Sequence, residues 1–188
     1  MATKTTQSVH LKERFIQEIA PKLKEELGIK NVMAVPKVTK VTLNVGIGSY
    51  IKAYGKDYQA VVDNIASITG QKPVVTKAKK AISNFKLREE TPVGVTVTLR
   101  GVKMYDFLNK LVNVIFPRVR DFRGLSPKSF DGNGNFSVGF KEHMVFPEIS
   151  PDDIMKPHGL EINVTTSAKN DDEGFALLKA LGFPFKKK

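Results

Sequence analysis

The chain has 188 residues, of which 41% are hydrophobic, and its formal net charge is +11. This length and apolar content suit one folded domain over residues 1–188, with flexible tails at 1–9 and 186–188, and exclude a disordered chain. Without cysteine or an apolar run long enough to cross a bilayer, the chain is expected to lack disulfides, thiolate chemistry and membrane spans. We expect a cytoplasmic protein whose positive charge attracts nucleic acid, or in second place an anionic membrane.

The first predicted element is a helix that begins at Leu11. Pro21 should kink or split this helix because proline has no amide hydrogen, and Gly28 should end it. Apolar residues at every fourth position define its buried side: Leu11, Phe15, Ile19, Leu23 and Leu27. A strand is predicted next, within PKVTKVTLNVGIG at 36–48, followed by a helix at about 57–69.

The rest of the chain is predicted to form four strands and two helices, separated by loops. In order these are a short strand with a basic loop at 71–88, a strand at 93–100, a helix at 104–116 that Pro117 ends, a short strand near 135–140 and a strand at 160–166. The final helix should start after Asn170, with Glu173 completing a capping box, and should end at Gly182.

Alternation along the three best strands predicts an α+β fold, with an antiparallel sheet, helices packed on one face and a polar second face. Apart from Glu161, the outward positions carry amides, hydroxyls and cations: Lys40, Thr42, Asn44, Thr96, Thr98, Arg100, Asn163 and Thr165. Such a face can contact phosphates and 2′-hydroxyls of RNA, but it is also what a merely solvated sheet shows. The pattern alone leaves both interpretations open.

A basic loop lies between Asp63 and Glu89, a window without any acidic residue. Its cations are Lys72, Lys77, Lys79, Lys80, Lys86 and Arg88. A loop of one charge sign gains from a polyanion through counterion release. Phe85 is expected to anchor the loop in the core, with stacking on a base as the alternative. A second cationic cluster, Arg118, Arg120 and Arg123, could clamp phosphates, unless Asp121 holds one of the three in an ion pair.

Enzyme signals are weak. Gly46 and Gly48 follow a strand, but Ile51 stands where a dinucleotide fingerprint needs a third glycine. The histidines, His10, His143 and His158, share no metal-ligand spacing, and Glu142 beside His143 is expected at the surface. We therefore predict no catalytic residues, no metal and no cofactor. A nucleotide-dependent enzyme that uses the Gly46–Gly48 turn is the alternative, and a free-standing nucleic-acid chaperone is another.

Several long motifs resemble one family. These are TGQKPVVTKAKKAISNFKLRE, TLRG, MYDFL, PRVRDFRGL, SFDGNGN, FPEI and TTSAKNDDEG. From about Leu11 to Phe185, the chain is similar to the bacterial large-subunit ribosomal protein that binds 5S rRNA, the fifth in the large-subunit naming series. The resemblance implies a non-catalytic α+β scaffold that seats 5S rRNA in the central protuberance and contacts 23S rRNA and neighbouring 5S-binding proteins. It also implies contacts with peptidyl-site tRNA and with a small-subunit head protein at an intersubunit bridge.

Carried over residue by residue, the resemblance implies two sets of contacts. The 5S rRNA contacts fall on Lys37, Lys40, Asn44, Gln71, Thr96 and Thr98, and the tRNA-facing loop falls on Thr76, Lys77, Lys79, Lys80, Ser83 and Asn84. The arginine cluster at 118–123 is expected to contact RNA or the opposite subunit. Three positions depart from the family pattern: Asn133 replaces Arg in a GRGN turn, Glu90 replaces Gly before the long strand, and Ala81 replaces Ser in the loop.

Overall fold

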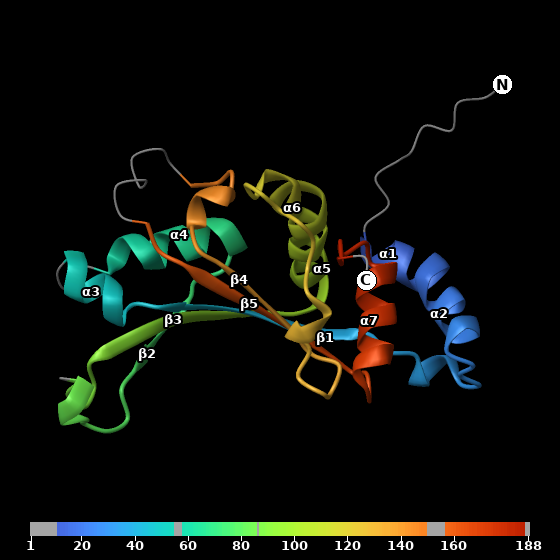
Figure 1. The fold of residues 1–188 in the computed structure, drawn as a ribbon, viewed down its shortest axis with the longest axis horizontal. Helices are drawn as coiled ribbons and strands as arrows, with labels where there is room; N and C mark the ends of the chain where they lie inside the picture. Colours follow the sequence, from blue (N-terminus) through green and yellow to red (C-terminus); the bar gives the residue numbers. More distant parts are fainter. Residues whose placement is uncertain (1–10, 55–57, 86, 150–156, 187–188) are drawn as a thin grey trace. The chain divides into compact units, whose positions relative to one another are not determined.

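The computed structural model describes residues 11–54, 58–85, 87–149 and 157–186. It contains a five-stranded antiparallel sheet with helices, in the strand order β2-β3-β1-β5-β4, which confirms the predicted α+β class (Figure 1). The strands are β1 Val38–Gly46, β2 Val74–Lys77, β3 Pro92–Leu99, β4 Phe136–Phe140 and β5 Leu160–Thr166. The α-helices are α1 Leu11–Arg14, α2 Ala20–Glu26, α3 Gly48–Tyr54, α4 Gln59–Thr69, α5 Gly101–Lys110, α6 Phe116–Arg118 and α7 Asp171–Ala180. The remaining described elements are two π-helical turns, η1 Phe15–Ile19 and η4 Leu111–Ile115, and four 3₁₀ turns, η2 Val32–Ala34, η3 Ser83–Phe85, η5 Pro127–Ser129 and η6 His143–Val145.

The chain packs as two compact units. The first unit consists of Met1–Lys40, Arg100–Phe136 and Thr165–Lys188, and the second of Val41–Leu99 and Ser137–Val164. This division describes packing rather than independent folding, so the expectation of a single domain stays a prediction. The expected tails at 1–9 and 186–188 fall, except for Lys186, outside the described residues.

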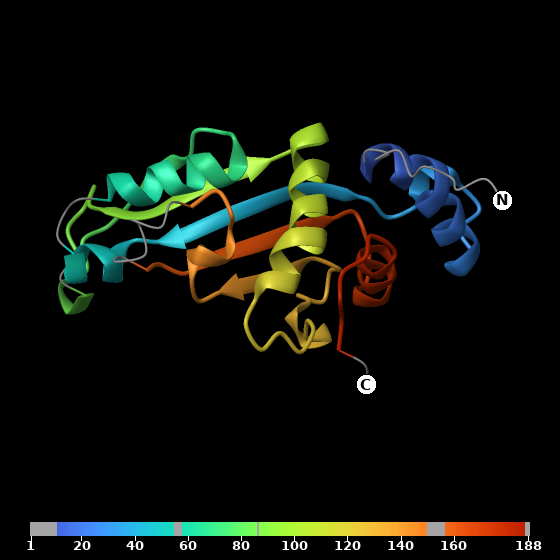
Figure 2. The same cartoon turned by 90° about the horizontal axis from the view of Figure 1, so that it is seen from above.

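The second unit buries one side of its strands beneath α3 and α4. Three pairs of apolar residues on β1 and β3 lie directly opposite one another and are buried: Val41 and Leu99, Leu43 and Val97, and Val45 and Val95. Both helices contact β3, and α4 contributes the buried Val61, Ile65 and Ile68 to this core. Figure 2 shows α4 alongside β3 when the sheet is seen from above. The helix α3 was not predicted, because its seven residues are too few to show a helical period.

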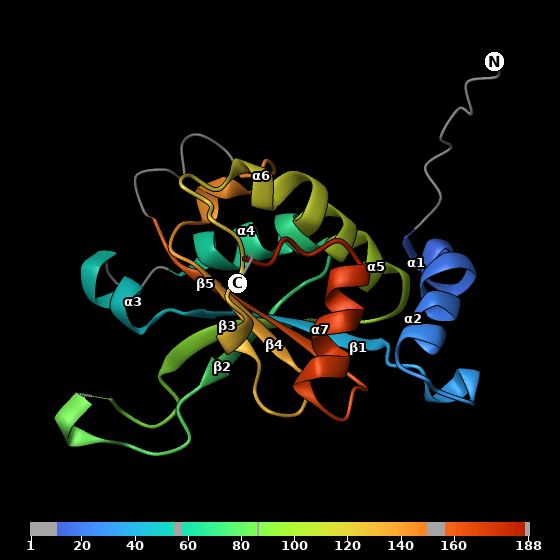
Figure 3. The same ribbon diagram turned by 45° about the vertical axis from the view of Figure 1, so that its right-hand side comes forward.

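Beyond Lys77, the chain turns back toward β3 as a two-stranded arm. The Ala78 amide donates to the Thr91 carbonyl (2.9 Å), and Ile82 and Leu87 exchange both backbone hydrogen bonds (2.9 and 3.1 Å). The short turn η3 forms the tip, and Figure 3 shows the arm extending away from α3 and α4 of the same unit. The basic loop expected at 71–88 is therefore a hairpin built on β2 and β3.

In the first unit, α1, η1 and α2 follow one another as one helix, and so do α5, η4 and α6. Each of these two helices contains a wider π-helical turn just before a proline. The Ala20 amide donates to the Phe15 carbonyl and the Phe116 amide to the Leu111 carbonyl, each five residues back. Proline lacks the amide hydrogen and crowds the carbonyl four residues earlier, and a wider turn relieves that crowding. Helical residues run without a break from Leu11 through Pro21 to Glu26, so the first helix is not split at Pro21, and the helix predicted to end before Pro117 continues to Arg118.

The loop before β4 packs directly against α7 in the first unit. A Cβ atom at Gly174 would lie 2.6 Å from the Gly134 carbonyl oxygen, so only glycine fits there. The Gly134 amide donates to Asp171 Oδ1 (2.9 Å), and the Thr166 hydroxyl donates to the Gly134 carbonyl (2.8 Å). The predicted capping box is wrong in its pairing, because Glu173 accepts from the Lys169 amide while the side chain of Asn170 makes no capping hydrogen bond.

Candidate nucleic-acid interface

The side of β1 and β3 that faces away from α4 carries neutral polar groups. Within the second unit Thr42 lies opposite Thr98, and Asn44 lies opposite Thr96. All four side chains are half-buried, so they remain accessible from this side. These four residues alternate along the strands with buried valines and leucines. They are accessible because successive side chains of a strand point to opposite faces.

Hydrogen bonds hold part of this surface in place. The Thr96 hydroxyl donates to the Leu43 carbonyl (3.0 Å), which fixes its rotamer and leaves its oxygen lone pairs available. Gln71 is exposed and donates from Nε2 to the Thr98 carbonyl (3.3 Å). The structure thus brings together four of the six residues expected to contact 5S rRNA: Asn44, Gln71, Thr96 and Thr98.

The other two expected 5S contacts belong to the first unit. Lys37 precedes β1 and is exposed, and its amide donates to the Ser167 hydroxyl (3.0 Å) while its carbonyl accepts from the Ser167 amide (2.9 Å). Lys40 is half-buried near the start of β1. Each supplies a positive charge, which the exposed side of β1 and β3 in the second unit does not contain.

Sequence reasoning missed that β2 extends the polar side. Val74 lies opposite Thr96 with 64% of its surface exposed, and Thr76, expected in a loop, lies opposite Gly94. The ladder then shifts register, so that Lys77 pairs with Pro92 at the base of the arm. The strand VVTK is only four residues long, and strand pairing alone shows which of its side chains are exposed.

The described cations of the arm are all exposed, as are its expected contact residues Ser83 and Asn84. Phe85, expected to anchor the loop in the core, is 68% exposed, so that prediction is wrong. The reason is geometric, because a two-stranded arm has no second layer in which to bury an aromatic ring. Ile82 is also 43% exposed, which leaves two apolar side chains near the tip among Lys79, Lys80 and Arg88. Lys86 lies outside the described residues.

The three arginines of the second cationic cluster, Arg118, Arg120 and Arg123, are exposed in the first unit, at and beyond the end of α6. Asp121 adopts a left-handed backbone conformation with φ of 53°. Among the described residues no ion pair joins it to these arginines, so the ion-pair alternative is not observed. All three guanidinium groups remain accessible.

The glycine-rich turn is organised by Asp131. Its Oδ1 accepts the amides of Asn133 (2.9 Å) and Asn135 (3.0 Å), and its Oδ2 accepts the Asn135 side-chain amide (2.7 Å). These bonds, chiefly that from the Asn135 side chain, lower the pKa of Asp131 because they stabilise its charged form. The turn thus depends on a backbone contact at position 133, and the exposed Asn133 side chain is not needed to form it.

Two histidines that are far apart in sequence meet in the second unit. His143 and His158 are buried with their rings stacked at 4.0 Å, and the His158 amide donates to His143 Nδ1 (3.2 Å). No sequence spacing foretold this contact. In the part of the chain that the structure describes, no group of three or more His, Asp or Glu side chains could hold a metal ion. Glu142 is exposed, as expected.

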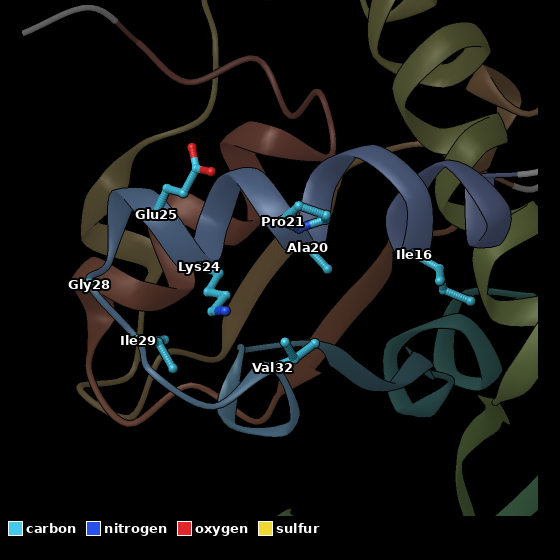
Figure 4. A pocket seen from close by; sticks show the side chains of 8 residues that line it. All are labelled: Ile16, Ala20, Pro21, Lys24, Glu25, Gly28, Ile29 and Val32. Carbon is cyan, nitrogen blue, oxygen red and sulfur yellow. The ribbon is translucent and has the colours of Figure 1, made fainter.

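Two hollows lie in the first unit. One of about 430 Å³ is bounded by α2 and the segment that follows it, with Ile16, Pro21, Ile29 and Val32 among its lining residues (Figure 4). The other, of about 660 Å³, is lined by Phe130, Phe175 and Phe185 together with Asp172 and Lys179. None of the residues predicted to contact RNA lines either hollow.

No helix in the described ranges is both long and apolar enough to span a membrane. The net charge of +11, the accessible polar side of the sheet and the cationic arm define a basic α+β protein whose surface suits RNA. The comparisons with known proteins show which such protein it resembles. Residues 31–88 match the family described as ribosomal protein L5, and residues 92–185 match the model of the C-terminus of the same ribosomal family.

Relatives named as large ribosomal subunit protein uL5 match this chain over nearly their whole length. The large ribosomal subunit protein uL5 of Halothermothrix orenii is 57% identical over 175 residues, 93% of this chain and 97% of the relative. The protein of the same name from Desulfatibacillum aliphaticivorans is 56% identical over 94% of this chain and 98% of the relative, and that from Chloroflexus aggregans is 51% identical over 95% and 99%. The chain belongs to the ribosomal protein L5 family.

Family membership decides several predictions. The chain is a structural constituent of the large ribosomal subunit and not an enzyme, so the nucleotide-dependent enzyme built on Gly46 and Gly48 is excluded. Its place is the ribosome, which in bacteria lies in the cytoplasm, as predicted. The same membership argues against the free-standing chaperone.

Proposed function

We propose that the chain binds 5S rRNA through the exposed side of β1 and β3, together with Gln71. The observation that carries this proposal is the grouping of Asn44, Gln71, Thr96 and Thr98 on one accessible surface. Amides and hydroxyls on a rigid sheet offer donors and acceptors at fixed positions, which suits recognition of RNA shape and 2′-hydroxyls. Lys37 and Lys40 supply charge for phosphates.

The arm is proposed to contact peptidyl-site tRNA. Its exposed cations, Lys77, Lys79 and Lys80, attract the phosphate backbone, and Thr76, Ser83 and Asn84 add hydrogen-bonding groups. Phe85 supports this role, because an exposed ring among cations can stack on an unpaired base. The arm is stiffened by its own backbone hydrogen bonds, so it can hold these groups away from the sheet.

Further partners are proposed from the resemblance. These are 23S rRNA, neighbouring 5S-binding proteins and a small-subunit head protein at an intersubunit bridge. The accessible guanidinium groups of Arg118, Arg120 and Arg123 support a phosphate or carboxylate contact, since the planar guanidinium binds both in a bidentate manner.

A filter-binding comparison tests the central proposal. The full chain is titrated against 5S rRNA and against a tRNA at the same salt concentration. We expect a clear preference for 5S rRNA, and loss of that preference in the double variant Asn44→Ala/Thr96→Val. Equal binding of both RNAs by the parent chain would contradict the proposal.

A sucrose gradient at high salt separates the ribosomal role from that of a free chaperone. A constituent of the large subunit co-migrates with it, whereas a chaperone held by charge alone dissociates as salt screens its phosphate contacts. We expect the chain in the large-subunit fractions.

A further inference from the structure

Gly46 is a glycine that the protein itself does not require. It lies in β1 with an ordinary backbone conformation, and a Cβ atom built on it would meet no atom within 4 Å. Glycine destabilises a strand relative to alanine because it loses more conformational freedom on folding. A glycine in a strand often marks a bulge, a tight bend or a place where a ligand or another backbone approaches closely, and the paired ladder of β1 has no bulge at Gly46.

The residue opposite Gly46 is also a glycine. This partner across the ladder is Gly94, so two glycines face each other on the polar side of the sheet. Unlike Gly46, Gly94 is required by packing, since a Cβ atom there would lie 2.8 Å from Thr76 Oγ1 and 3.3 Å from the Val45 carbonyl oxygen. Asn44 Oδ1 lies 3.7 Å from the same point, so a hydroxyl and an amide cover Gly94, which is buried, whereas Gly46 is exposed.

The chemistry of this spot is neutral. On β1 and β3 the second unit exposes Thr42, Asn44, Thr96 and Thr98 around the two glycines, and none of these carries a charge. None of these four side chains could pair with the charge of a phosphate. The ribose 2′-hydroxyl, which is both donor and acceptor, matches the amide of Asn44 and the hydroxyl of Thr76. In A-form RNA, 2′-hydroxyls line a wide and shallow minor groove, whose surface fits a flat sheet.

We infer that Gly46 is a ribose-docking spot, at which the sugar edge of an RNA minor groove lies directly on the backbone of β1, beside the side chains of Asn44 and Thr76. This inference rests on the proposed binding of 5S rRNA by the same surface. It assigns to Gly46 the role of keeping space open, and it makes the contact specific for RNA over DNA.

Gly46→Val tests the inference because the added side chain enters open space and suits a strand. We expect thermal unfolding at or above the parental temperature, and binding of 5S rRNA weakened roughly tenfold by steric exclusion of the sugar. The preference for 5S rRNA over a DNA strand of the same sequence should shrink as well. Should Gly46→Val unfold, Gly46→Ala takes its place, with a smaller loss expected.

Gly139→Val is the matched control. Gly139 is also an exposed strand glycine without protein atoms near its Cβ position, but it lies on β4 at the other edge of the sheet from β2. The Gly139→Val variant should bind 5S rRNA as tightly as the parent. An equal loss of affinity in the Gly46 and Gly139 variants would overturn the assignment to Gly46.

Asn44→Ala separates this inference from the proposed function. If Asn44→Ala weakens binding while Gly46→Val does not, the docking spot is wrong and the 5S-binding surface stands. If neither variant weakens binding, the surface itself is wrong.

Discussion

The polar side of the sheet and the arm are joined at Lys77, yet they offer RNA opposite chemistry. On β1 and β3 in the second unit the sheet exposes a neutral amide, hydroxyls and Gly46, held in register by a paired ladder. The arm exposes Lys79, Lys80 and Arg88 beside the apolar Ile82 and Phe85, and has only its own hairpin bonds to hold it. The sheet surface can discriminate between RNA shapes, whereas the arm can attract any nucleic acid and stack on unpaired bases.

The difference teaches that the net charge of a chain does not locate its selective surface. Charge attracts every phosphate backbone, so selectivity has to come from neutral groups at fixed positions. In this chain the neutral groups lie on the rigid strands and the concentrated charge lies on the projecting hairpin. The following experiments test that division, beginning with the largest expected effect.

Salt should weaken binding while leaving selectivity intact. If about six phosphates are neutralised, affinity for 5S rRNA falls roughly a thousandfold between about 50 and 200 mM salt. Affinity for tRNA should fall in parallel, because both losses come from charge. Filter binding at four salt concentrations gives both slopes, and a preference for 5S rRNA that vanishes with salt would assign selectivity to charge instead.

Phe85→Ala should weaken the contact with peptidyl-site tRNA about tenfold, since stacking of one base on an aromatic ring contributes about 1–3 kcal/mol. The free energy of unfolding should change by less than about 0.5 kcal/mol, because the ring is exposed. The measurement is tRNA dissociation from ribosomes that carry the variant. Ile82→Ala is the control, since its side chain has no ring, and an equal effect there would rule out stacking.

Asn44→Ala and Lys79→Ala should separate selectivity from affinity. The ratio of 5S rRNA to tRNA affinity should fall about fivefold for Asn44→Ala, because a fixed hydrogen-bonding group is lost from the sheet surface, and a hydrogen bond contributes about 1 kcal/mol. Lys79→Ala should lower both affinities slightly and leave the ratio near its parental value. Identical ratios for the two variants would remove the distinction between sheet and arm.

Glu90→Gly should stabilise the base of the arm. Glu90 has φ of 61°, a left-handed conformation that costs a side-chain-bearing residue about 1–2 kcal/mol and glycine very little. After the entropy cost of glycine is subtracted, we expect the free energy of unfolding to rise by up to about 1 kcal/mol, as measured by chemical denaturation. Glu89→Gly is the control, because Glu89 does not have a positive φ, and it should be neutral or destabilising.

Much of the sheet was readable from sequence because one buried side imposes a period of two. Thr42, Asn44, Thr96 and Thr98 were placed correctly on the accessible side by parity alone. Their pairing across strands was not readable, nor was the contribution of Val74, because register depends on which strands meet. The family resemblance, not the period, pointed to Gln71.

The errors have physical causes as well. Phe85 was assigned to the core because aromatic side chains are usually buried, but the hairpin that carries it has no partner layer within the arm. The stacked pair of His143 and His158 depends on contacts between segments far apart in the chain, which a local pattern does not report. The wide turns before Pro21 and Pro117 let helices pass residues that usually end them.

The first unit is assembled from three separate stretches of chain, and the last of them, Thr165–Lys188, contains α7. A nascent polypeptide emerges amino end first, so every residue of the second unit, through Val164, is synthesised before α7 exists. Gly174, whose missing side chain admits the Gly134 carbonyl, is made after every residue of the second unit. During translation, the unit that carries the surface proposed for RNA is therefore complete earlier than the unit that contains α7.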